Sequence, residues 1–196
     1  MTAATPPTPA GGVDLHAGRR PTVGDGLLRA LGDATVLAAA DVRVALALTD
    51  LAGGAADPDG QVALAAALAV RAVRLGHVFA DLATAPTTIA PEDEEVAVDV
   101  AALAWPDPDA WVAAVATHPL TAVGGGGPTD RPLRLAGTRL YLDRYWRHER
   151  AITADLLARA GGPAPTVDTA ALADGLDRLF PSSVLAPDFG ALAPKS

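Results

Sequence analysis

The hydrophobic positions of this chain recur mostly at helical spacing, separated by short breaks rich in glycine, proline and polar residues. Residues 61–75 show this most clearly, because Leu64, Leu68 and Leu75 recur at intervals of four and seven, with alanines between them. Small side chains at the remaining positions allow neighbouring elements to approach closely. Gly76 follows where a C-terminal cap is expected. This stretch is predicted to be the central helix.

Capping residues and prolines mark six further helices by the same pattern. Acidic or proline residues stand at the start of several of them, where carboxylates favour the positive end of the helix dipole. The predicted helices cover residues 26–31, 42–51 with Asp41 as the cap, 91–105 starting at Pro91 and its carboxylates, 108–118 behind Asp107, 143–160, and 168–180.

One stretch alternates with the period of a strand, since residues 133–142 predict a small β-hairpin with its turn at 136–138. Residues 77–82 are expected to form a short extended or turn segment. The expected fold is mainly α: a small helical domain of about six to seven helices with one short β-hairpin. It occupies residues 24–181, between a disordered tail at 1–23 and an irregular tail at 182–196.

The hairpin leads directly into the helix at 143–160. The helical spacing predicts that the buried face of this helix carries Tyr145, Ile152 and Leu156, with Trp146 and Leu157 at its margin.

Charge and composition narrow the functional classes. The net charge of -8 argues against nucleic-acid binding by the domain as a whole, because phosphate neutralisation needs a basic face. The absence of cysteine excludes disulfides, thiolate metal sites and cysteine nucleophiles. The longest apolar run, residues 62–70, is about half of what a membrane-spanning helix needs, and no secretory signal is visible. A soluble, cytoplasmic protein without a membrane partner is expected.

No catalytic, cofactor-binding or metal-ligating residue is predicted. Lys195 is the sole lysine and lacks the glycines of a phosphate-binding loop, and residues 124–127 are a run of glycines that predicts a plain flexible loop. No two of the four histidines share the i, i+4 spacing that places both on one helix face. The acidic run at 92–95 is typical of a solvated helix start.

The stretch Leu140–Arg150, here called the aromatic–basic segment, is the exception in a chain of small side chains. It holds both tyrosines, one of the three tryptophans and three arginines. Three roles of this segment are open. Its aromatic side chains could fill the core while its arginines pair with nearby carboxylates, or the segment could bind a protein. In the third, its aromatic rings stack on nucleic-acid bases while its arginines bind the phosphates. A step of three residues turns a helix by about 60° short of a full circle, so the arginines cannot all be buried on one face. The candidate interface or core anchors are Tyr141, Arg144, Tyr145, Trp146, Arg147 and Arg150.

At this segment the chain resembles the N-terminal domain of the RecD subunit (alpha chain) of exodeoxyribonuclease V, the RecBCD helicase–nuclease. The resemblance is carried by Leu140–Arg150, by Gly76-His-Val-Phe79 at the end of the central helix, and by Leu179-Phe-Pro181. The order of elements also agrees, and the likeness covers roughly residues 25–181.

The resemblance implies a subunit of a machine that processes DNA ends in recombination and double-strand-break repair. In the family this domain packs against the RecC-type gamma subunit, through it reaches the RecB-type subunit, and precedes an ATP-driven motor. DNA is then met only as part of the complex. The motor motifs are absent from this chain, so ATP and Mg²⁺ are expected only in the missing motor domains, and the chain is a fragment, a truncated reading frame or a free-standing domain. The alternative function is a free-standing regulatory or single-stranded-DNA-binding domain with no motor partner.

Overall fold

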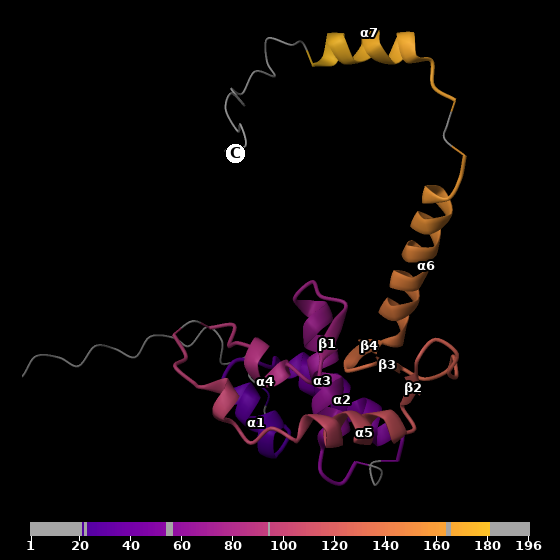
Figure 1. The fold of residues 1–196 in the computed structure, drawn as a ribbon. Helices are drawn as coiled ribbons and strands as arrows, with labels where there is room; N and C mark the ends of the chain where they lie inside the picture. The colour runs from indigo at the N-terminus through magenta and orange to yellow at the C-terminus, as the bar shows by residue number, and fades with distance from the viewer. Residues whose placement is uncertain (1–20, 22, 54–56, 94, 164–165, 181–196) are drawn as a thin grey trace, which may run out of the picture. The chain divides into compact units, whose positions relative to one another are not determined.

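The computed structural model describes residues 21, 23–53, 57–93, 95–163 and 166–180. Apart from Pro21 and Val23, the two predicted tails lie outside the described residues. The chain divides into two compact units, residues 1–153 and 154–196. Figure 1 follows the elements along the chain. The prediction of a mainly helical chain is confirmed, with seven α-helices in the described part.

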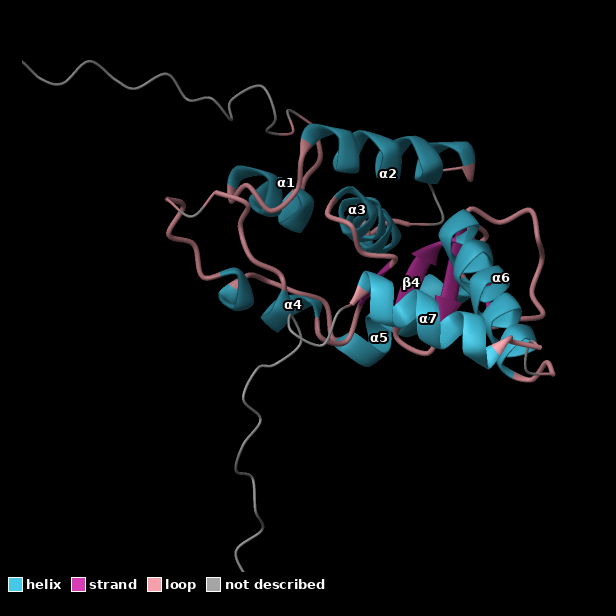
Figure 2. Ribbon diagram, turned by 90° about the horizontal axis from the view of Figure 1, so that it is seen from above, coloured by secondary structure: helices cyan, strands magenta, loops and turns pink. Residues whose placement is uncertain are grey.

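The predicted central helix is present as α3, Gln61–Arg74. Every residue from Val62 to Ala69 is buried, so the helix is enclosed on all sides. Figure 2 shows α3 nearly end-on, with α2 (Ala39–Leu51) on one side and α5 (Pro108–Thr117) and the sheet on the other. The alanines of α3 allow this close packing, because they add little width between helix axes. Gly76 takes a left-handed φ of 85° after the helix, as a C-terminal cap requires.

The first two helices of the chain also match the sequence pattern. The predicted helix at 26–31 is α1, Gly26–Asp33. In α2, Asp41 lies in the first turn rather than before it, so its prediction as the capping residue is wrong in position. Its carboxylate still accepts a hydrogen bond from the backbone N–H of Ala38 at 2.9 Å. Asp41 is fully buried and receives two hydrogen bonds from Arg74, at 3.0 and 2.7 Å.

The predicted helix at 91–105 is wrong. The region contains the short helix α4, Ala85–Thr88, an irregular stretch, and one 3-10 turn at Val100–Ala102. Its carboxylates have other partners, because Glu92 pairs with Arg74 at 2.5 Å and Asp99 accepts hydrogen bonds from the backbone of the 3-10 turn. Valine at every second position from 96 to 100 also favours extended backbone over helix. Tertiary ion pairing and β-branching therefore override the local helix signal.

The hairpin is confirmed and lies inside a larger sheet. Strands β3 (Leu133–Ala136) and β4 (Arg139–Leu142) pair antiparallel. Two strands extend the pair: β1 (Phe79–Asp81) runs antiparallel beside β4, and β2 (Thr121–Val123) runs parallel beside β3. The order across the sheet is β1-β4-β3-β2. Strand β1 lies within the extended segment predicted at 77–82, whereas β2, three residues long, was not predicted.

The last two helices have the predicted bounds. Helix α6 covers Asp143–Ala160, and α7 covers Thr169–Leu179 behind Asp168, whose carboxylate accepts from two backbone N–H groups. The predicted burial of α6 is wrong, however. Ile152, Leu156 and Leu157 are 60%, 59% and 67% exposed, and Leu156 and Leu157 lie beyond Thr153, where the first unit ends.

Candidate binding surfaces

The aromatic–basic segment begins as the last residues of β4 and continues into α6 without a loop. Asp143 makes this possible, since its backbone N–H donates to the carbonyl of Pro132 at 2.8 Å while its buried side chain turns toward the sheet. There its carboxylate accepts from the Arg134 guanidinium, with Nε to Oδ1 at 2.9 Å. The start of α6 is thus fixed to β3 by a buried ion pair.

Arg134 has three further contacts besides Asp143. It is almost fully buried, and its two terminal nitrogens donate to the carbonyls of Gly124 and Pro128, each at 3.0 Å. Gly124 begins the glycine run and Pro128 follows it, so the predicted loop has no regular secondary structure and is joined to Arg134 at both ends. The guanidinium carbon also lies 4.7 Å from the ring centroid of Trp146. Arg134 therefore joins a strand, a loop and a helix.

Tyr141, the first candidate anchor, lies in the sheet and is buried. Its ring contacts Phe79 of the neighbouring strand at a centroid distance of 5.3 Å. Burial raises the pKa of the phenol above its usual range, and the Glu149 charge adds to the effect. The position of Tyr141 suits a core side chain.

The other two aromatic candidates are half-buried on the first two turns of α6. Trp146 contacts two guanidinium groups, those of Arg134 and Arg150. The guanidinium carbon of Arg150 lies 6.0 Å from the Trp146 ring centroid. Tyr145 accepts a hydrogen bond from Arg144 at 3.0 Å and meets His148 edge-on, with ring centroids 6.3 Å apart. Both rings are therefore held by cationic neighbours rather than by apolar contacts alone.

The three candidate arginines, Arg144, Arg147 and Arg150, are all exposed. Their spacing around the helix required only that they not all be buried on one face. Arg147 pairs with Asp143 one turn before it and donates to the carbonyl of Thr129. Whether the six candidates bind a partner stays a prediction, but the structure brings all of them together at the β4–α6 junction.

The helical turn of about 100° per residue places Tyr145, Ile152 and Leu156 on one side of α6. These three residues therefore share a face of α6, as predicted from the sequence. Only Tyr145, near the start of the helix, is half-buried, whereas Ile152 and Leu156 are exposed. From Ala151 to Phe180, every described residue is exposed except Gly175, which is half-buried. Helix α7 likewise exposes Leu172, Leu176 and Leu179, at spacings of four and three. Two helices therefore present apolar faces that no described side chain covers.

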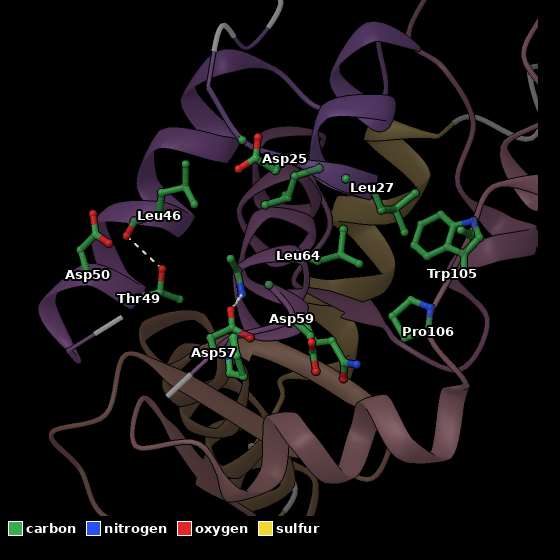
Figure 3. A pocket seen from close by; sticks show the side chains of 18 residues that line it. Asp25, Leu27, Leu46, Thr49, Asp50, Asp57, Asp59, Leu64, Trp105 and Pro106 are labelled. Atoms are coloured by element: carbon green, nitrogen blue, oxygen red, sulfur yellow. Dashed lines mark hydrogen bonds between the residues drawn. The ribbon is translucent and has the colours of Figure 1, made fainter. Parts of the chain in front are cut away.

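A hollow of about 740 Å³ lies in the first unit (Figure 3). Leu27, Leu64 and Trp105 gather on one side of it, and Asp50 and Asp57 lie on the other. Asp57 is engaged in the fold, because its carboxylate accepts from the N–H groups of Val62 and Ala63 at the start of α3, at 3.0 and 2.8 Å. The hollow therefore has an apolar wall and carboxylates opposite it, but the Asp57 carboxylate is already occupied in capping α3.

His118 is buried at the end of α5, with Nδ1 accepting from the backbone N–H of Leu120 at 3.2 Å. Burial lowers the pKa of its imidazole, and the nearby Asp57 charge opposes this only partly. In the described part of the chain no three histidine, aspartate or glutamate side chains are placed to hold a metal ion. Nor does that part contain a helix that is both long and apolar enough to cross a membrane.

Sequence reasoning missed Arg134. Alternation along β3 suggests that Leu133 and Leu135 face inward and that Arg134 faces solvent, yet all three are buried because both faces of the strand are covered. The available signal was a single charge within an apolar hairpin strand, followed nine residues later by a carboxylate where the strand becomes a helix.

Comparisons with known proteins place the chain in a family. Residues 33–141 match the family model described as RecBCD enzyme subunit RecD, N-terminal domain. The chain is 46% identical over 138 residues to a protein of Mycolicibacterium smegmatis named RecBCD enzyme subunit RecD, covering 68% of this chain and 22% of that protein. It is 43% identical over 159 residues to the protein of the same name from Mycobacterium tuberculosis, covering 80% of this chain and 24% of the relative. The chain spans about a quarter of the length of these relatives. With more than half of its residues matched by the model, it belongs to the family of RecD N-terminal domains.

Proposed function

We propose that this domain docks a RecD-type subunit onto its partner in a RecBCD-type enzyme, the RecC-type gamma subunit, and through it onto the RecB-type subunit. The names of the relatives support a subunit role, since each is called a subunit of the RecBCD enzyme. The proposed setting is the cytoplasmic repair of double-strand breaks and recombination. DNA is met within the complex, and the ATP and Mg²⁺ of a RecD-type motor bind outside this chain.

The observation that carries the proposal is the pair of uncovered apolar faces on α6 and α7. Ile152, Leu156 and Leu157 on α6, and Leu172 and Leu176 on α7, are each about half exposed or more. Burying a leucine side chain contributes about 1.5–3 kcal/mol, so a partner that covered several of them would gain substantial free energy. Amphipathic helices typically bind a groove in a partner through such i, i+4 anchors.

The test is binding of the 196-residue chain to a purified RecC-type subunit, followed by size-exclusion chromatography and calorimetry. We expect a stable complex that persists at raised salt, because apolar burial is not screened. Leu156→Asp and Leu176→Asp should each weaken it, since a carboxylate would be buried. Val98→Asp is the matched control, because Val98 is also exposed but lies in the irregular stretch before the 3-10 turn and belongs to neither α6 nor α7.

The rival function is single-stranded-DNA binding by the exposed arginines of the aromatic–basic segment. It predicts affinity for an oligonucleotide that falls steeply as salt rises, because counterion release drives such binding. Failure to bind the RecC-type subunit, together with salt-sensitive oligonucleotide binding, would overturn the docking proposal.

A further inference from the structure

A second surface, independent of the α6 and α7 faces, lies where α2 meets the start of α6. It is a groove of about 580 Å³ in the first unit, here called the α2–α6 groove. Its volume lies within the range of about 300–1,000 Å³ that is typical of binding pockets. The groove is lined by Val44, Leu48, Thr129, Asp130, Arg131, Pro132, Leu142, Asp143, Arg144, Arg147 and His148.

The floor of the groove is aliphatic and partly exposed. Val44 is 44% exposed and Leu48 is half-buried one turn later on α2. The same stripe continues to Leu51, which is 85% exposed, so the i, i+4, i+7 positions of α2 form an uncovered ridge. Leu142 and Pro132 complete the floor from the side of the sheet. A helix lying along this ridge could pack against it as helices pack in protein interiors.

The wall of the groove is cationic. Arg131, Arg144 and Arg147 line it with His148, in a chain whose net charge is -8. Of the two carboxylates present, Asp143 is already neutralised by the buried Arg134 and by Arg147. The Nε atom of Arg131 is buried and makes no hydrogen bond within the described structure, since its ion-pair contact with the Asp130 carboxylate is 3.7 Å long. An unpaired buried donor costs free energy that an added acceptor would recover.

We infer that the α2–α6 groove binds an acidic amphipathic helix of a protein partner. Its aliphatic side chains would lie on Val44, Leu48 and Leu142, and its carboxylates would face the arginines. The lining contains no tryptophan, tyrosine or phenylalanine, and the His148 imidazole is its one aromatic ring, so the groove offers no row of rings on which successive bases could stack, the usual contact with single-stranded nucleic acid. The aliphatic floor and the Asp130 carboxylate also disfavour phosphates. A protein helix therefore fits the chemistry better than an oligonucleotide.

The experiment uses the 196-residue chain and three fluorescent probes. The first is an alanine-based helical peptide with leucines at i, i+4 and i+7 and glutamates flanking that stripe, the second is its counterpart with lysines for glutamates, and the third is an oligo-dT strand. Fluorescence anisotropy should show saturable binding of the acidic peptide only. Amide shifts in ¹H–¹⁵N spectra of the unsubstituted protein should move around Val44, Leu48 and Arg144. Equal binding of the lysine peptide, tighter binding of oligo-dT, or shifts confined to other residues would each overturn the proposal.

Two pairs of variants test the floor and the wall separately. Val44→Asp should lower the affinity at least about tenfold, because it places a carboxylate under the aliphatic anchors, whereas Val98→Asp at a similarly exposed valine should leave it unchanged. Arg144→Glu should weaken binding by about tenfold at low salt. Arg159→Glu makes the same charge change outside the first unit and should have little effect. Equal affinities within either pair would overturn the assignment of that part of the groove.

Discussion

Replacing Arg134 by methionine should destabilise the first unit more than any exposed substitution. The change removes the main buried partner of Asp143 and leaves the carbonyls of Gly124 and Pro128 without their donor. Breaking a buried ion pair by removing one partner costs about 3–5 kcal/mol. Arg147 still pairs with Asp143 from the solvent side, so we expect the low end, about 3 kcal/mol. Such a loss is a large part of the roughly 5–15 kcal/mol that stabilises a typical domain.

The assay is urea unfolding followed by tryptophan fluorescence and circular dichroism. Arg131→Met is the matched control, since that guanidinium is one-third exposed and makes only a long contact of 3.7 Å with Asp130, and should change the free energy of unfolding by less than about 0.5 kcal/mol. Adding Asp143→Asn to Arg134→Met should recover part of the loss, because no uncompensated charge then remains buried. A loss below about 1 kcal/mol for Arg134→Met, or no coupling between the two substitutions, would refute the proposed role of the ion pair.

Three other substitutions test separate parts of the structure. Arg74→Met should lower the free energy of unfolding by about 2–3 kcal/mol in the urea assay, because it leaves the fully buried Asp41 carboxylate without its cation; an unchanged midpoint would contradict this. The pKa of His118 lies below its ordinary 6.5 in the folded chain, so its contribution to stability is complete above that pH and is lost as the pH falls through the lowered pKa. His118→Gln should therefore flatten the stability profile on the acid side of 6.5, and an unaltered profile would exclude His118 as its source. Trp146→Ala should lower the Tm by about 3–6 °C if the ring holds the junction, whereas an unchanged Tm with lost partner binding would place it in an interface.

The sequence predicted correctly those helices whose first residues are fixed by a capping side chain close by in the sequence. Asp107 before Pro108 and Asp168 before Thr169 start helices where expected, because each carboxylate accepts backbone N–H groups of the next turn. The segment at 91–105 failed for the opposite reason, since Glu92 is paired with an arginine 18 residues away in sequence. Local sequence patterns do not reveal a contact between residues so far apart in the chain.

The candidate site was predictable as a location but not as an arrangement. Clustering of large side chains pointed to residues 140–150, and helical spacing correctly grouped Tyr145 with Ile152 and Leu156. Spacing tells which residues share a face and not whether anything covers it. Arg134 was missed because its burial depends on the sheet being covered on both sides, which no single strand reveals.

The junction at which β4 becomes α6 without a loop has a mechanical consequence. Eighteen helical residues rise about 27 Å, so α6 is a stiff rod with one end clamped in the sheet through Asp143. A tension applied at the distal end of that rod would pass through the backbone into β4 with no loop between them to absorb it. The load would then be shared by the pairing of β4 with its two neighbouring strands, the hydrogen bond from the Asp143 N–H to Pro132, and the Arg134–Asp143 ion pair.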